Sequence, residues 1–313
     1  MVEAGILAAV AIVMALIAIY IPVLGAFVNF IWPLPIIACG VRNGLKWSLL
    51  TTVVAGLICA MLINPLQAFI LVAVFGILGI ILGECMRRNS SPLTILTYGT
   101  LGGILALVIN FAIAFLVLNI NPIAMIFDSF DNSLLQMAEF QRSHGVAEAE
   151  IAASVASYKE LIKMMRIIMP GAFLITAPAL AFINYWVAKK ILTKLGNKFE
   201  DIPPFRNLVI PRWWLLPFGL SLMAVGFAVK YYGPEHWAYL TAVNIQMVSS
   251  SVFMLQGLAI AYWYVHAKNK PTFWAHIVTV LIMFQIISFA VLWIGAFDCI
   301  ADFRKLRGVK SEH

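Results

Sequence analysis

Long apolar segments restrict what this chain can fold into more than any other feature. Nine stretches of the 313-residue sequence approach the length of about 20 residues that an α-helix needs to cross a bilayer. They are residues 4–21, 27–40, 44–63, 65–86, 92–118, 167–192, 213–232, 237–266 and 272–297. Only 11% of the residues are charged, whereas a soluble domain carries about 25%. The sequence therefore predicts an all-α, polytopic transmembrane helix bundle of about nine spans.

Prolines mark several helix boundaries in this pattern. The second segment, 27–40, is short and contains Pro33 and Pro35, so we predict that it is broken or re-entrant. Elsewhere a capping side chain directly precedes a proline, which is favourable because the first helical residue needs no N–H partner. Such helix starts are expected at Asn64–Pro65, Ser91–Pro92 and Asn121–Pro122.

Basic residues predict the orientation. If the spans alternate, twelve Lys and Arg residues of the loops fall on one side, which the positive-inside rule makes cytoplasmic. They are Arg42, Lys46, Arg87, Arg88, Lys189, Lys190, Lys194, Lys198, Arg206, Arg212, Lys268 and Lys270. The connections at 63–65 and 233–236 carry none. We therefore expect a multi-pass protein of the bacterial cytoplasmic (plasma) membrane with its N-terminus in the cytoplasm.

The C-terminal tail conflicts with a count of nine. Nine alternating spans would place the tail outside, but its basic residues favour the cytoplasm. These residues are Arg304, Lys305, Arg307 and Lys310. Either one of the nine segments does not cross the membrane, or the tail is an exception to the rule.

The longest polar stretch, 119–166, predicts the domain organisation. Apolar residues recur in it at helical spacing on both sides of His144–Gly145, which predicts two amphipathic helices that form an external hairpin. This hairpin is either a structural cap or a lid over an outward-facing pocket. We expect a six-helix membrane unit at 1–197 that includes the hairpin, a cytoplasmic linker at 198–212, and a three-helix unit with a basic tail at 213–313.

Residue patterns for catalysis are absent from the sequence. The histidines and cysteines do not recur at the spacing that gathers metal ligands, and no nucleotide-binding or nucleophile motif is present. Charged residues within the spans are few: Glu84 lies beside Arg87 and Arg88, and Asp298 lies near the end of the last span. The sequence predicts a protein that is not an enzyme, with no cofactor, metal site, proton relay or nucleic-acid partner.

Neutral amides are the polar groups that the spans do contain. An amide in hydrocarbon needs a partner, which is usually another helix and otherwise water or a ligand. The amides lie at Asn29, Gln67, Asn110, Asn184, Asn244, Gln246, Gln256 and Gln285. Small residues also recur on helix faces, above all at Ala4, Ala8, Ala11 and Ala15, where either internal packing or a contact with another protein would use them.

The N-terminal part resembles the S components of energy-coupling-factor (ECF) vitamin transporters. The resemblance covers roughly residues 4–195 and depends on the alanine-rich first helix and on four short segments. These segments are Trp32–Pro35, Gly40–Gly44, Asn64–Pro65 and Phe75–Gly83. The whole chain, with its three additional C-terminal spans, is similar to the YybS-like (DUF2232) family of bacterial membrane proteins.

The S-component resemblance implies roles for particular residues. Ala4, Ala8, Ala11 and Ala15 would dock a membrane coupling subunit. A small organic molecule would bind on the outer side, at residues placed like Asn29, Trp32, Gln67 and Asn110.

Two functions follow from these patterns. The first is a substrate-binding and transport module that relies on a partner for energy. The alternative is a membrane scaffold without transport activity, like the cell-shape protein MreD, that acts in envelope growth or sporulation through contacts with other membrane proteins.

Overall fold

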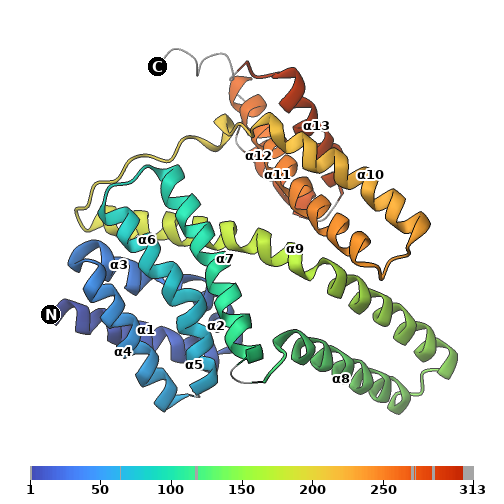
Figure 1. Ribbon diagram of the computed structural model, residues 1–313, viewed down its shortest axis with the longest axis horizontal. Coiled ribbons are helices and arrows are strands. Elements are labelled where there is room, and N and C mark those ends of the chain that lie inside the picture. The colour runs from blue at the N-terminus through green and yellow to red at the C-terminus, as the bar shows by residue number, and fades with distance from the viewer. Residues whose placement is uncertain are drawn as a thin grey trace. The chain divides into compact units, whose positions relative to one another are not determined.

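The computed structural model describes residues 2–63, 65–116, 119–268, 271, 273–283 and 286–305, and the regular structure of these residues is entirely helical (Figure 1). Asn64, Lys270, Gln285, Arg307 and Lys310 of the sequence predictions lie outside the described residues. The helices are α1 (Val2–Tyr20), α2 (Pro22–Ile31), α3 (Leu34–Asn43), α4 (Leu45–Leu62), α5 (Pro65–Leu71), α6 (Ile77–Arg87), α7 (Pro92–Leu116), α8 (Pro122–Ser143), α9 (Glu148–Lys194), α10 (Leu215–Tyr231), α11 (Trp237–Ala267), α12 (Phe273–Met283) and α13 (Ser288–Ala301). Within the described residues, eight helical segments are long and apolar enough to cross a membrane. The predicted all-α polytopic bundle is confirmed.

The chain forms two compact units. Unit 1 comprises residues 1–159 and 176–201, and unit 2 comprises residues 160–175 and 202–313. The division at 201/202 falls inside the linker that we predicted at 198–212. The middle of α9 belongs to unit 2, however, and the sequence-based division did not anticipate this assignment.

Unit 1 is built around the first helix. Helix α1 packs against α2, α3 and α4, and its alanine face lies in a core that also contains Ile36 of α3 and Ala55 of α4. The predicted break in the second segment is confirmed, because α2 ends at Ile31 and α3 begins at Leu34. Proline prevents a regular helix there by removing a backbone donor.

Small residues let the later helices of unit 1 approach closely. A π-helical turn at Val72–Gly76 joins α5 to α6. Gly40 of α3 lies against the backbone of Gly83 in α6, so that an added methyl group would lie 3.1 Å from the Gly83 Cα. Gly103 of α7 faces Ala177 of α9, where an added methyl group would lie 3.5 Å from the Ala177 Cβ. Close backbone contact of this kind is how helices associate without a hydrophobic driving force in lipid.

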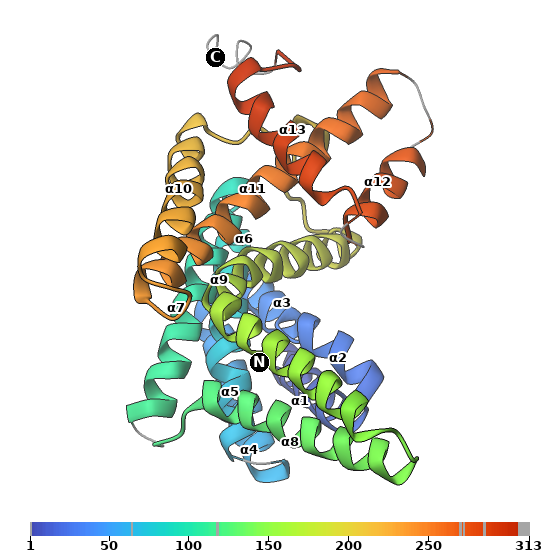
Figure 2. The ribbon, with the colours of Figure 1, turned by 90° about the vertical axis from the view of Figure 1, so that its right-hand side faces the viewer.

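Unit 2 is formed by α10, α11, α12, α13 and the middle of α9. Its core contains Phe218 of α10, Phe253 of α11, and Ala296 and Cys299 of α13. The Phe218 and Phe253 rings meet edge to face, with 5.0 Å between centroids. Helices α10 and α11 are joined by a short connection at 232–236 and pack against each other as an antiparallel pair (Figure 2).

Two predicted boundaries are wrong. The second amphipathic helix of the external hairpin does not end before the sixth span, because α9 runs continuously for 47 residues through both. The predicted ninth span, 272–297, is not one helix but two, α12 and α13, with 11 and 14 residues. The sequence carries no proline between 272 and 297, so the break in this apolar run could not be predicted from its pattern.

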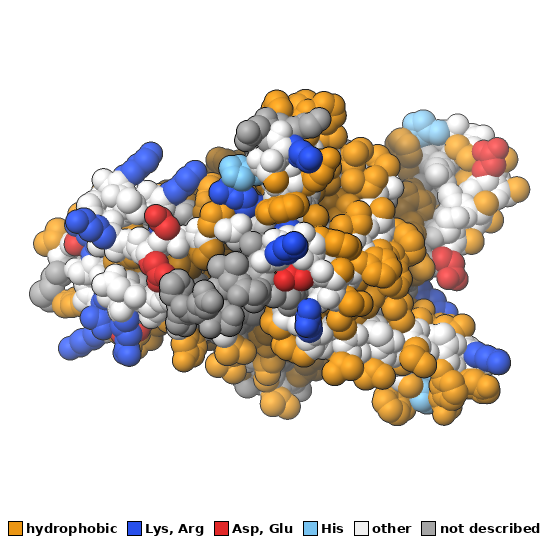
Figure 3. All heavy atoms as spheres, turned by 90° about the horizontal axis from the view of Figure 1, so that it is seen from above, with side chains coloured by type: hydrophobic (Ala, Val, Ile, Leu, Met, Phe, Trp, Pro, Cys, Tyr) orange, Lys and Arg blue, Asp and Glu red, His pale blue; other side chains and the backbone are white. Residues whose placement is uncertain are grey.

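Large apolar side chains cover the outside of the helices. They include Val13 of α1, Leu57 of α4, Leu105 of α7 and Met223 of α10, all exposed. Figure 3 shows such side chains over much of the visible face, while the Lys and Arg side chains gather in a few places. An apolar exterior is what a protein with lipid as its solvent needs.

Candidate functional site

The predicted ligand residues of unit 1 occupy different environments. Trp32 is fully buried, and its only side-chain donor, the indole Nε1–H, donates to the Ala11 carbonyl oxygen (2.9 Å). Gln67 of α5 is exposed, and Asn29 of α2 is half-buried. Trp32 therefore fixes the break between α2 and α3 against α1, and its donor is unavailable to a ligand in this structure. Ligand binding by Asn29, Trp32 and Gln67 stays a prediction.

Asn110, the fourth predicted ligand residue, lies near the C-terminal end of α7. Its side-chain Nδ2 is buried and has no hydrogen-bond partner among the described residues. A buried donor without a partner costs about 1–3 kcal/mol, and native structures leave few of them. The amide is therefore ready to donate to an acceptor oxygen that the described chain does not supply.

The predicted partner face of α1 is covered by the chain's own helices. Ala11 and Ala15 are 0% exposed, and Ala4 and Ala8 are buried as well. The Thr51 hydroxyl of α4 donates to the Ala4 carbonyl oxygen (3.4 Å). Partner docking through these alanines stays a prediction, and it would require α1 to separate from α2, α3 and α4.

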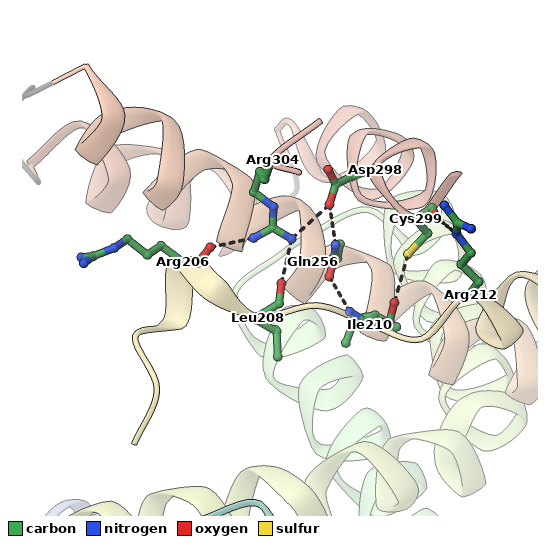
Figure 4. A network of polar contacts seen from close by, with 8 residues as sticks. All are labelled: Arg206, Leu208, Ile210, Arg212, Gln256, Asp298, Cys299 and Arg304. Atoms are coloured by element: carbon green, nitrogen blue, oxygen red, sulfur yellow. Dashed lines mark hydrogen bonds and ion pairs between the residues drawn. The ribbon is translucent and has the colours of Figure 1, made fainter. Parts of the chain in front are cut away.

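A polar constellation of several buried side chains lies in unit 2, where the sequence offered few signals. We call it the C-terminal polar cluster: Gln256 of α11, Asp298 of α13, Arg304 after α13, and the backbone of 206–210 (Figure 4). Arg304 Nη2 donates to Asp298 Oδ2 (3.0 Å) and to the Leu208 carbonyl oxygen (2.7 Å). Its Nη1 donates to the Arg206 carbonyl oxygen (2.7 Å). The guanidinium thus binds α13 and the segment before α10 at once.

Gln256 completes the cluster from α11. Its Nε2 donates to Asp298 Oδ2 (2.5 Å), and its Oε1 accepts from the Ile210 backbone N–H (2.9 Å). Next to it, Arg212 Nε donates to the Cys299 carbonyl oxygen (3.0 Å). A cation at these terminal carbonyls of α13 is favourable, because a helix end leaves its last carbonyls without backbone donors.

The cluster holds a buried ion pair. The side chains of Asp298 and Arg304 are each 1% exposed. Asp298 Oδ1 and Arg304 Nε have no hydrogen-bond partner among the described residues. Buried ionisable groups in a membrane protein are expensive, so they are retained where they hold or perform something specific. The sequence suggested only an acidic residue near a span end and a basic tail, and nothing in their spacing predicted that the two would pair.

A second amide acts across helices inside unit 2. Asn244 of α11 accepts from the Gly171 backbone N–H (2.6 Å) through Oδ1 and donates to the Ile167 carbonyl oxygen (2.8 Å) through Nδ2. Residues 167 and 171 stand in the i and i+4 relation that an α-helix normally joins by its own bond. One side-chain amide therefore serves both groups beside Pro170 of α9, which explains why the middle of α9 belongs to unit 2.

Comparison with known proteins adds a family and a relative. Residues 9–299 match the family model described as "Predicted membrane protein (DUF2232)". A Bacillus subtilis (strain 168) protein described as "Uncharacterized protein YybS" is 24% identical over 279 residues, which cover 89% of this chain and 88% of that protein. No solved structure matches the chain.

Proposed function

The chain belongs to the DUF2232 family of predicted membrane proteins, and from this premise we propose that unit 1 binds a small polar organic molecule on the outer side of the membrane for transport. The family assignment confirms the predicted YybS-like resemblance over most of the chain. The observation that carries the proposal is the buried, unpartnered amide donor of Asn110.

The chemistry of Asn110 suggests the class of ligand. An amide N–H is satisfied by a carbonyl, carboxylate or hydroxyl oxygen. Helix α7 ends six residues later at Leu116, and the chain continues into α8 after residue 121. If the N-terminus is cytoplasmic, this end of α7 faces outward, so an external molecule with an acceptor oxygen fits the position.

The hairpin formed by α8 and the beginning of α9 supports the same site. Arg142 and Glu148 form an ion pair across its turn (2.6 Å), and the Ser154 hydroxyl donates to Gln141 Oε1 (3.1 Å). These contacts keep the two helices of the hairpin together as one element. The hairpin follows directly on the α7 end that carries Asn110, so we propose that it is the lid of this site.

The proposal includes no catalytic step and no energy source in the chain itself. The sequence holds no nucleotide-binding motif, so a partner membrane protein would supply the energy for transport. We therefore expect a binding module rather than an enzyme, located in the bacterial plasma membrane.

Native mass spectrometry of the purified protein tests this function. We expect a stoichiometric small molecule on the wild type, and its loss from Asn110→Ala. The matched control is Asn207→Ala, which removes an exposed amide outside unit 1 and should leave occupancy unchanged. Two results together would contradict ligand binding: a wild-type protein that carries no molecule, and higher thermal stability of Asn110→Leu. The buried amide N–H of Asn110 would then only destabilise the folded protein, because no ligand satisfies it.

The scaffold alternative is favoured by one specific observation. Several buried polar side chains of unit 1 are satisfied by the unit's own backbone, as Ser48 is by the Ile36 carbonyl oxygen (3.0 Å) and Thr52 by the Ser48 carbonyl oxygen (2.9 Å). Such an interior suits a scaffold that works through its outer surface. An empty protein that co-purifies with a stable membrane partner after cross-linking would favour this function over transport.

A further inference from the structure

We propose that α12 and α13 form a re-entrant hairpin, so that the chain crosses the membrane eight times and its C-terminus lies in the cytoplasm with its N-terminus. The proposal concerns topology and is independent of any ligand. It resolves the conflict between nine predicted spans and a basic tail.

Helices α10 and α11 define the two sides of unit 2. These helices are antiparallel neighbours, and the helical segments that contain them, Arg212–Tyr231 with 20 residues and Trp237–Ala267 with 31 residues, are long enough to cross. At 1.5 Å per residue the two segments extend about 30 Å and about 46 Å, against a hydrocarbon core of about 30 Å. The start of α10 and the end of α11 therefore lie on one side, which we call the loop side. Phe205, before α10, meets Tyr262, near the end of α11, edge to face with 5.7 Å between centroids.

The end of α13 lies beside the segment that precedes α10. Arg304 binds the carbonyl oxygens of Arg206 and Leu208, and Arg212 binds those of Cys299 and Ile300. These contacts tie the C-terminal end of α13 to the segment that enters α10 (Figure 4). Figure 2 shows the same arrangement, with the start of α10, the end of α11 and the end of α13 at one end of the unit. The end of α13 is therefore on the loop side.

Helices α12 and α13 are both short. Helix α12 follows α11 and so starts on the loop side, and α13 ends there. With 11 and 14 residues, α12 and α13 extend only about 17 Å and about 21 Å. Each is short of the hydrocarbon core of about 30 Å, and both outer ends of the pair lie on the loop side, so the pair enters and leaves by the same face. Non-helical backbone at membrane depth is tolerated where protein covers it, and α13 packs along α11.

Charge agrees with this placement. The described basic residues at the end of α13 are Arg304 and Lys305, and the loop side of unit 2 also carries Arg206, Arg212 and Lys268. With eight crossings all of them lie on one face, as the positive-inside rule requires. With nine crossings Arg304 would have to reach Arg206 and Leu208 from the opposite face.

Cysteine labelling in intact cells tests the topology. The described native cysteines are buried or half-buried, so background labelling is low. We compare Lys305→Cys with Glu235→Cys, an exposed position in the 232–236 connection, using a membrane-impermeant maleimide. The expected result is labelling of Glu235→Cys in intact cells and labelling of Lys305→Cys only after the membrane is opened. Labelling of Lys305→Cys in intact cells would overturn the proposal.

A second measurement does not depend on substituted side chains. A protease-cleavable tag is added after His313 or inserted in the 232–236 connection, and inverted vesicles are compared with right-side-out vesicles. We expect the C-terminal tag to be cut only in inverted vesicles and the inserted tag only in right-side-out vesicles. Cleavage of both tags in the same vesicle orientation would mean nine crossings and would refute the hairpin.

Discussion

Arg304 shows how one side chain can organise a membrane unit. Its guanidinium satisfies two backbone carbonyls and one carboxylate that belong to segments about ninety residues apart in the chain. Arginine suits this role because its donors lie in a rigid planar fork and its charge is permanent. The pair with Asp298 is buried, so removing one partner alone leaves a charge without compensation.

For this ion pair we predict that a single substitution destabilises the protein much more than a double substitution of both partners. Arg304→Ala should destabilise the protein by about 3–5 kcal/mol, because Asp298 is left buried and unpaired. The double variant Asp298→Asn with Arg304→Gln removes both charges, so it should lose clearly less stability than Arg304→Ala. Thermal unfolding in detergent measures both, with Lys305→Ala, an exposed neighbour, as the control. Equal losses in the single and double variants would contradict the importance of the unpaired charge.

Helix–helix contact in unit 2 depends on a reciprocal pair of glycines. A methyl group on Gly257 of α11 would overlap the Val291 carbonyl oxygen of α13. A methyl group on Gly295 of α13 would overlap the Phe253 carbonyl oxygen of α11. The two backbones thus touch at both points, and this contact seats α13 against a helix long enough to cross the membrane.

At the element scale Gly257→Ala should therefore be severely destabilising. Overpacking costs about 1–3 kcal/mol even where side chains can move, and here the obstacle is backbone. The matched control is Gly226→Ala in α10, where an added methyl group meets nothing within 4 Å. That control should be neutral or more stable by up to about 1 kcal/mol, through helix propensity. Comparable melting temperatures for the two variants in detergent would argue against the close α11–α13 contact.

Over the whole molecule, α9 links the two units through the chain itself. Its residues 160–175 belong to unit 2, and its flanking parts belong to unit 1. Within unit 2, Asn244 holds this part of α9 by binding backbone groups on both sides of Pro170. Gly171 permits the approach, since a methyl group there would lie 2.8 Å from Asn244 Oδ1.

We predict that the chain can be divided at the 198–201 segment without losing this association. Fragments 1–198 and 199–313, produced together, should co-purify, because unit 2 needs residues 160–175 of the first fragment. Asn244→Leu in the second fragment should weaken the co-purification. Gln246→Leu, which changes an amide two residues further along α11, serves as the control. Fragments that never associate would show that 160–175 is not an integral part of unit 2.

The sequence by itself determined the class of protein, most helix positions and the family. Long apolar runs and few charges permit only transmembrane helices, and Pro33 predicted the break between α2 and α3 because proline acts locally. Asn29, Gln67 and Asn110 were identifiable because an amide in an apolar run is visible in the pattern, and their role as ligand residues stays a prediction.

Only the tertiary structure decided which polar groups meet. The Trp32 indole N–H donates to the Ala11 carbonyl oxygen, and the alanine face of α1 is covered by other helices of unit 1. Asp298 pairs with Arg304, which lies just after the end of α13. The division of the last apolar run into α12 and α13 was likewise visible only in the structure, where α13 packs on α11. Hydropathy reports whether a segment prefers lipid, but which donor finds which acceptor depends on contacts between residues far apart in the chain.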